Sequence, residues 1–157
     1  MLSARLAELH AMERLLDHAV EVVDLGWVQG AWFTVATDDA TKAVTAYDLH
    51  QIDTHPVSGA CLVGAVVHAA GGPATVGSQL VQRTLDLTWH VLREDAGRAV
   101  RWSPAPRTRM IRVLDLTHWN DAPERTQGEV VGLLRAARRA AGEQREGCLA
   151  ERSAVTG

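Results

Sequence analysis

The segment from Gly59 to Ala70, GACLVGAVVHAA, constrains the fold more than any other part of the chain. Its residues are apolar on nearly every side of a helix, so we expect this helix at the buried centre of the domain. Ser58 is a candidate N-cap, and the pair Gly71 and Gly72 should end the helix. The rest of the chain must therefore pack around this segment.

Three further helices are predicted from apolar side chains that recur at three- and four-residue steps. They cover residues 2–25, about 78–95 and about 125–139. Thr126 and Glu129 have the spacing of a capping box at the start of the last helix. Residues 31–37 and 42–48 are short, roughly alternating stretches on either side of the turn-forming TDDAT. They predict a small β-hairpin.

Composition is consistent with one soluble domain. The chain has 157 residues, 46% of them hydrophobic, and a formal net charge of −3, which gives no support to general nucleic-acid binding. Residues 1–142 are predicted to form one mainly α domain, a compact bundle of about four principal helices with the hairpin. Residues 143–157 are expected to be a flexible polar tail.

The expected cellular location rests on the lack of a membrane-spanning run, of signal-peptide features and of an expected disulfide. The longest mostly apolar run, residues 60–70, is too short to span a bilayer. The amino-terminal segment lacks the features of a signal peptide. The two cysteines, Cys61 and Cys148, lie in unrelated surroundings and do not suggest a disulfide, which favours a reducing compartment. We therefore expect a cytoplasmic protein with no membrane partner.

Three segments resemble a known family. They are GWVQGAW at 26–32, CLVGAVVHAAG at 61–71 and WNDAPERTQGEVVGLLRAA at 119–137. In this order they are similar to DUF6197, a family of small bacterial domains, mainly actinobacterial and phage-associated, of unknown function. The resemblance covers most of residues 10–141 and implies a helix-rich fold but no reaction. The insertion EDAGRAVRWSPAPRTRM at 94–110 departs from the family pattern.

Cys61 is the candidate nucleophile. It lies near the amino end of the central helix, where the dipole and unpaired N–H groups favour a thiolate. His118 could act as its general base, with Asn120 or Asp121 orienting the imidazole. Alternatively, Cys61 is a small buried core residue, as most free cysteines are. On that interpretation Asn120 and Asp121 only tie down the turn before the last helix.

Ligand-binding candidates come from the aromatic residues. Five tryptophans stand against one tyrosine and one phenylalanine. Large rings either fill a small core or line an apolar pocket. Trp27, Trp32 and Trp119 lie in the family-like segments, and Asn120 follows the last of them. His68 stands on the central apolar helix, where a buried imidazole needs a partner, either a backbone carbonyl or a group in a cavity.

Two other polar groups are weaker candidates. His50, Asp53 and His55 carry metal-ligating atoms, but their spacing matches no strong zinc pattern, so we expect no metal and no cofactor. Asp86 and His90 are four residues apart on one helix face, which is typical of a solvated surface pair.

Two functions are compatible with these features. The first is a small pocket-forming protein that binds, and in one version transforms, a small organic ligand or short peptide among Cys61, His68, His118 and Trp119. The second is a non-catalytic interaction or assembly protein that acts as a homodimer. The sequence has no phosphate loop, strong metal motif or nucleophile elbow, so it leaves open whether the protein is an enzyme. The pocket hypothesis requires the central helix to contact the Trp119–Asp121 corner.

Overall fold

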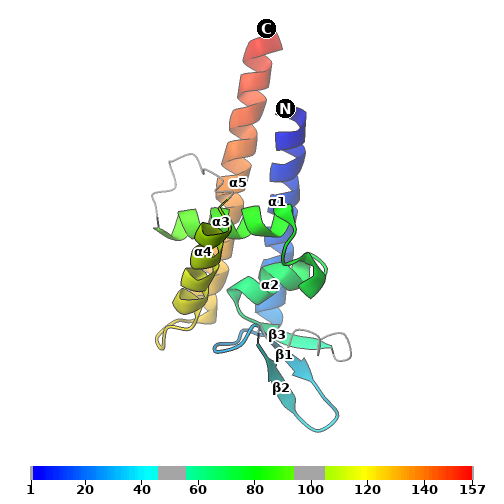
Figure 1. Cartoon of the computed structure of the whole chain (residues 1–157). Helices are drawn as coiled ribbons and strands as arrows, with labels where there is room; N and C mark the ends of the chain where they lie inside the picture. The colour runs from blue at the N-terminus through cyan, green and yellow to red at the C-terminus, as the bar shows by residue number, and fades with distance from the viewer. Residues whose placement is uncertain (1, 46–55, 94–104, 157) are drawn as a thin grey trace.

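The computed structural model describes residues 2–45, 56–93 and 105–156 (Figure 1). Within these ranges the chain is mainly helical, as predicted, but it has five α-helices rather than about four, a short 3-10 helix η2 and a three-stranded sheet. The elements are α1 (Leu2–Leu25), β1 (Phe33–Ala36), β2 (Thr41–Val44), β3 (Val57–Ala60), α2 (Leu62–Ala69), η2 (Pro73–Thr75), α3 (Gln79–Arg93), α4 (Pro106–Asn120) and α5 (Gln127–Thr156).

The two longest helices, α1 and α5, run antiparallel and form the spine of the molecule (Figure 1). Apolar side chains such as Leu16 and Leu134 are buried between them and the rest of the core. The sequence suggests that Glu13 lies on the solvated face of α1, but it is only 2% exposed. Arg138 and Arg145 of α5 reach its carboxylate, which explains how a charge can be buried there.

The central position of α2 is confirmed. All residues from Leu62 to Val67 are buried. The helix is capped by Cys61 rather than Ser58, because Ser58 lies in β3 and the Cys61 sulfur accepts the Gly64 N–H at 3.3 Å. Gly64 allows the Trp32 carbonyl group to lie close to the α2 backbone, since a Cβ built on Gly64 would be 2.1 Å from the Trp32 carbonyl oxygen. The chain before β1 therefore packs directly on the α2 backbone.

The predicted hairpin is confirmed, but it is part of a larger sheet. Strands β1 and β2 pair antiparallel, and β3 adds on the other side of β1 in the order β2-β1-β3. The third strand, VSGA, is too short and too poor in alternation to stand out in the sequence. It leads directly into Cys61 and thus fixes the start of α2.

Two segments are more helical than expected. For MIRVLDL at 110–116 the sequence predicts a short helix or strand that follows a proline-rich flap. The structure has the 15-residue α4 there, with Pro106 in its first turn, where a missing N–H costs nothing. Residues 119–120, expected to precede the last helix, form the end of α4. The last helix, expected to end near residue 139, continues as α5 through Thr156. The predicted polar tail is therefore largely a continuation of this helix.

Candidate functional site

Asn120 joins three parts of the chain at the end of α4. Its Oδ1 accepts hydrogen bonds from the Trp27 indole at 2.8 Å and the Leu62 backbone N–H at 3.1 Å. Its Nδ2 donates to the Val28 carbonyl at 3.1 Å and to Asp121 Oδ1 at 3.0 Å. These four bonds fill the capacity of an amide side chain, which is fully buried here. The expected contact between the central helix and the Trp119–Asp121 corner is confirmed.

The neighbours of Asn120 are also engaged in holding this junction. Asp121 Oδ1 accepts the Gly30 N–H at 3.1 Å. The Arg125 guanidinium lies 3.9 Å from the centre of the Trp119 ring and donates to the Trp119 carbonyl at 2.8 Å. The contacts of Trp27, Trp119, Asn120 and Asp121 thus support the structural interpretation that the sequence left open.

Cys61 has the opposite electrostatics to those of a nucleophile. The side chain is fully buried, and desolvation raises the pKa of the thiol from 9.0 to about 12, with the Gly64 N–H opposing the rise. At neutral pH the group is therefore a thiol. The expected thiolate is contradicted, because burial outweighs the N–H groups of the short helix α2. The alternative of a core cysteine is favoured.

This thiol should be protected in the native protein. In a Cys148→Ser variant, we expect no labelling of Cys61 by Ellman's reagent at about pH 8 until the chain is unfolded with urea. Because the thiol ionises near 9.0 when unfolded and near about 12 when folded, its contribution to stability is intact below pH 9 and is lost as pH rises from about 9 toward 12. Rapid stoichiometric labelling of the folded variant would restore the nucleophile hypothesis.

The two candidate histidines lie apart from any buried site. His68 was expected to be buried, but it is exposed on the outer side of α2, with its ring edge-on to Phe33 at 6.1 Å between centroids. His68 lies in the last turn of α2, after the fully buried run from Leu62 to Val67. His118 is exposed on α4 and lies outside the pocket described next.

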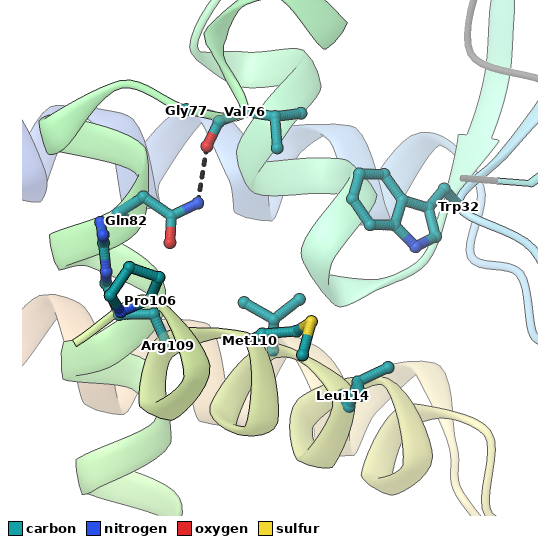
Figure 2. A pocket seen from close by; sticks show the side chains of 9 residues that line it. Trp32, Val76, Gly77, Gln82, Pro106, Arg109, Met110 and Leu114 are labelled. Atoms are coloured by element: carbon teal, nitrogen blue, oxygen red, sulfur yellow. Dashed lines mark hydrogen bonds between the residues drawn. The ribbon is translucent and has the colours of Figure 1, made fainter. Parts of the chain in front are cut away.

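A pocket of about 450 Å³ lies between α3, α4 and the Trp32 side chain (Figure 2). Trp32 precedes β1 and faces the side chains of α4 across the opening (Figure 2). The lining residues are Trp32, Val76, Gly77, Gln82, Pro106, Arg109, Met110, Val113 and Leu114. Of the eight candidates from the sequence, all of which the structure describes, Trp32 is the one that lines it.

The polar part of the pocket has a fixed orientation. Gln82 Nε2 donates to the Val76 carbonyl at 2.6 Å, which settles which end of the amide is nitrogen, because a carbonyl can only accept (Figure 2). Gln82 Oε1 consequently points toward α4 as an acceptor (Figure 2). Arg109 of α4 adds a cationic side chain to the lining of the pocket. The pocket thus combines an apolar body with a small polar end.

Ion pairs between α3 and α4 hold this wall in place. Arg112 pairs with the buried Asp86 and lies 4.5 Å from the centre of the Trp89 ring. Asp115 binds Arg93 at 2.6 Å and the Trp89 indole at 2.8 Å, and the Arg93 hydrogen bond lowers the pKa of Asp115. Leu116 is the one fully buried apolar residue of α4 in the structure, and Val113 and Trp119 are partly buried against the core.

The Asp86–His90 pair was wrongly expected on the surface. Both residues are buried, at 3% and 9% exposure, with the His90 ring 3.7 Å from the Asp86 carboxylate. The reason is α4, which covers this face of α3 and supplies Arg112 as a counter-charge. The four-residue spacing gave no sign of the covering helix.

Sequence reasoning missed most of the pocket, because its main wall is α4, a helix that begins within the insertion at 94–110 and continues beyond it. Met110, Val113 and Leu114 recur at three- and four-residue steps, which would have indicated a helical face. Gln82 carries no comparable signal. The metal candidates His50 and Asp53 lie outside the described residues, as does His55.

A model for a family of unknown function, DUF6197, matches residues 8–140. The chain belongs to the DUF6197 family. The matched range includes both the Asn120 junction and the pocket of this DUF6197 protein. No curated protein and no solved structure matches the chain.

Two further observations concern the part of the chain that the structure describes. In these residues, no three histidine, cysteine, aspartate or glutamate side chains are grouped so that they could hold a metal ion. No helix there combines the length and the apolar character needed to cross a membrane.

Proposed function

We propose that this DUF6197 protein binds a small, mainly apolar organic ligand in the pocket between α3, α4 and Trp32. The observation that carries the proposal is a pocket of about 450 Å³. This volume falls within the range of roughly 300–1,000 Å³ that is typical of small-molecule sites. Trp32, Met110 and Leu114 supply apolar surface on two sides of the pocket (Figure 2). An aromatic or branched apolar group would bury this surface, which is the main source of binding energy.

The polar groups suggest what else the ligand carries. Gln82 Oε1 is held as an acceptor, so a hydrogen-bond donor on the ligand would match it. Arg109 also lines the pocket, so its positive charge would favour an acceptor or anionic group on the ligand. Cys61, His118 and Asp121 are not among the lining residues, so the proposal is one of binding and not of catalysis by those residues.

The test is a titration with 1-anilinonaphthalene-8-sulfonate, a fluorescent probe with two apolar ring systems (naphthalene and phenyl), one N–H donor and one sulfonate anion. We expect one saturable site in the native protein. Leu114→Glu places a carboxylate on the apolar wall. It should lower the affinity for the probe by about ten-fold or more, which corresponds to about 1.4 kcal/mol of binding free energy.

Ile111→Glu is the matched control. Ile111 is exposed on the same helix and is not a lining residue, so the same substitution there should leave probe affinity unchanged. Urea unfolding of both variants checks that they remain folded. Equal affinity of the probe for the wild type and a folded Leu114→Glu variant would refute the pocket as the binding site.

A further inference from the structure

Helix α4 exposes an apolar stripe that extends beyond the pocket. Met110, Ile111 and Leu114 are 58%, 62% and 51% exposed. Together with Arg107 and His118 they recur at three- and four-residue steps, so all five lie on one face of the helix. We call these five residues the α4 stripe. The other large exposed hydrophobic residues in the described ranges are Leu25, Leu149 and Val155, which lie on other helices.

A ligand confined to the pocket would leave part of the stripe uncovered. Met110 and Leu114 line the pocket, whereas Ile111 does not. Clusters of exposed apolar side chains beside a groove are typical of surfaces that bind another protein segment. A partner helix with apolar residues at three- and four-residue spacing could place one side chain in the pocket and others on Ile111.

The charge of α4 indicates the chemistry of that partner. Arg107 is exposed near its amino end and His118 near its carboxyl end. Asp115, the one carboxylate in the α4 sequence, is bound by Arg93 and by the Trp89 indole. In the described residues, no side chain caps the first turn of α4, and the positive end of the helix dipole adds to the potential beside Arg107. The stripe thus carries the cation Arg107 and no carboxylate, although the chain as a whole has a net charge of −3.

We propose that the α4 stripe and the adjoining pocket bind a short amphipathic helix of a partner protein that has acidic residues flanking its apolar face. This proposal rests on the proposed function, because the pocket accepts the partner's anchoring side chain. Acidic flanks would complement Arg107, which no described carboxylate pairs. A second copy of this chain is a poorer occupant if its own stripe faces this one, since that stripe offers no acidic residue to Arg107.

The experiment is a selection from a phage-displayed library of random peptides of about 16 residues, a length that spans four helical turns. The full chain is the bait, and binders that also bind Ile111→Glu are removed. The enriched peptides are expected to carry apolar residues at three- and four-residue steps with acidic flanks. The best of them is then synthesised with fluorescein and titrated by anisotropy against the full chain and its variants.

Three variants separate this proposal from the pocket itself. Ile111→Glu should lower the affinity for the peptide by about ten-fold and leave the affinity for the naphthalene probe unchanged. Arg107→Glu should weaken the acidic peptide several-fold and increase affinity for the same peptide with lysines in place of its acidic residues. Leu114→Glu should lower the affinity for both the peptide and the probe.

Specific outcomes overturn the proposal. If the probe behaves as predicted but no acidic amphipathic peptide is enriched, or if the peptide binds Arg107→Glu as well as the wild type, the partner proposal fails and the pocket stands. If Leu114→Glu leaves the probe unaffected, the pocket fails and the partner proposal fails with it. If sedimentation shows a wild-type dimer that Ile111→Glu dissociates, the stripe binds a second copy of this chain and the partner proposal fails.

Discussion

Replacing Asn120 with alanine should lower the free energy of unfolding by about 3 kcal/mol or more. The change removes the acceptor of the Leu62 N–H and of the Trp27 indole, and the donor to the Val28 carbonyl. Leu62 is fully buried, so water cannot replace the lost bond to its N–H. Each buried group left without a partner costs about 1–3 kcal/mol. Urea unfolding followed by circular dichroism measures the difference.

His118→Ala is the matched control for Asn120→Ala. His118 lies two residues earlier on the same helix and is exposed, so its removal should change stability by no more than about 0.5 kcal/mol. Asn120→Asp separates the two ends of the amide, since it keeps an acceptor for Leu62 but loses the donor to Val28 and sets a carboxylate beside Asp121. If Asn120→Ala is as stable as His118→Ala, the junction does not hold α4 against α2.

Gly64→Ala should destabilise the protein by about 3 kcal/mol or more, which is large for one methyl group. The added Cβ would lie 2.1 Å from the Trp32 carbonyl oxygen and 2.9 Å from the Trp32 carbonyl carbon. Both atoms belong to backbone, and the Trp32 carbonyl accepts the Cys61 N–H at 3.0 Å, so the contact cannot be relieved by a side-chain rotation. Either α2 or the segment before β1 must move.

Gly132→Ala makes the same chemical change with the opposite expected sign. Gly132 is exposed on α5, and a Cβ there meets nothing within 4 Å. Alanine is favoured over glycine within a helix by about 0.5–1 kcal/mol, so this variant should be more stable than the wild type. Paired thermal and urea unfolding of the two variants gives the comparison. Similar effects for both would show that the close approach at Gly64 does not exist.

The sequence predicts well those elements whose signal is local. The burial of α2 follows from its lack of any polar face, and the start of α5 follows from the Thr126–Glu129 capping box, in which Thr126 Oγ1 accepts the Glu129 N–H at 3.2 Å and Glu129 accepts the Thr126 N–H at 3.1 Å. Asn120 and Asp121 do accept backbone N–H groups, as one of the two interpretations held, but these belong to Leu62 and Gly30 in distant segments and not to the turn before α5.

The features that the sequence could not predict depend on contacts between distant segments. Asp86 is buried because Arg112 lies across from it on α4, 26 residues later. Cys61 keeps its proton because the surrounding core outweighs its position at a helix start. The pocket requires Trp32 to face α4, and no pattern within either segment specifies that contact (Figure 2). Residue spacing identified candidate chemistry but not the place where a ligand would fit.

The most direct test of the pocket follows the naphthalene titration by NMR on protein labelled at its methionine methyl groups. The chain has three methionines, of which Met110 lines the pocket, whereas Met12 is buried in the core at 4% exposure. We predict that the Met110 methyl signal shifts in proportion to the fluorescence change, while the Met12 signal stays in place. A probe that binds without moving the Met110 signal, or that moves the Met12 signal instead, would contradict a ligand site between α3, α4 and Trp32.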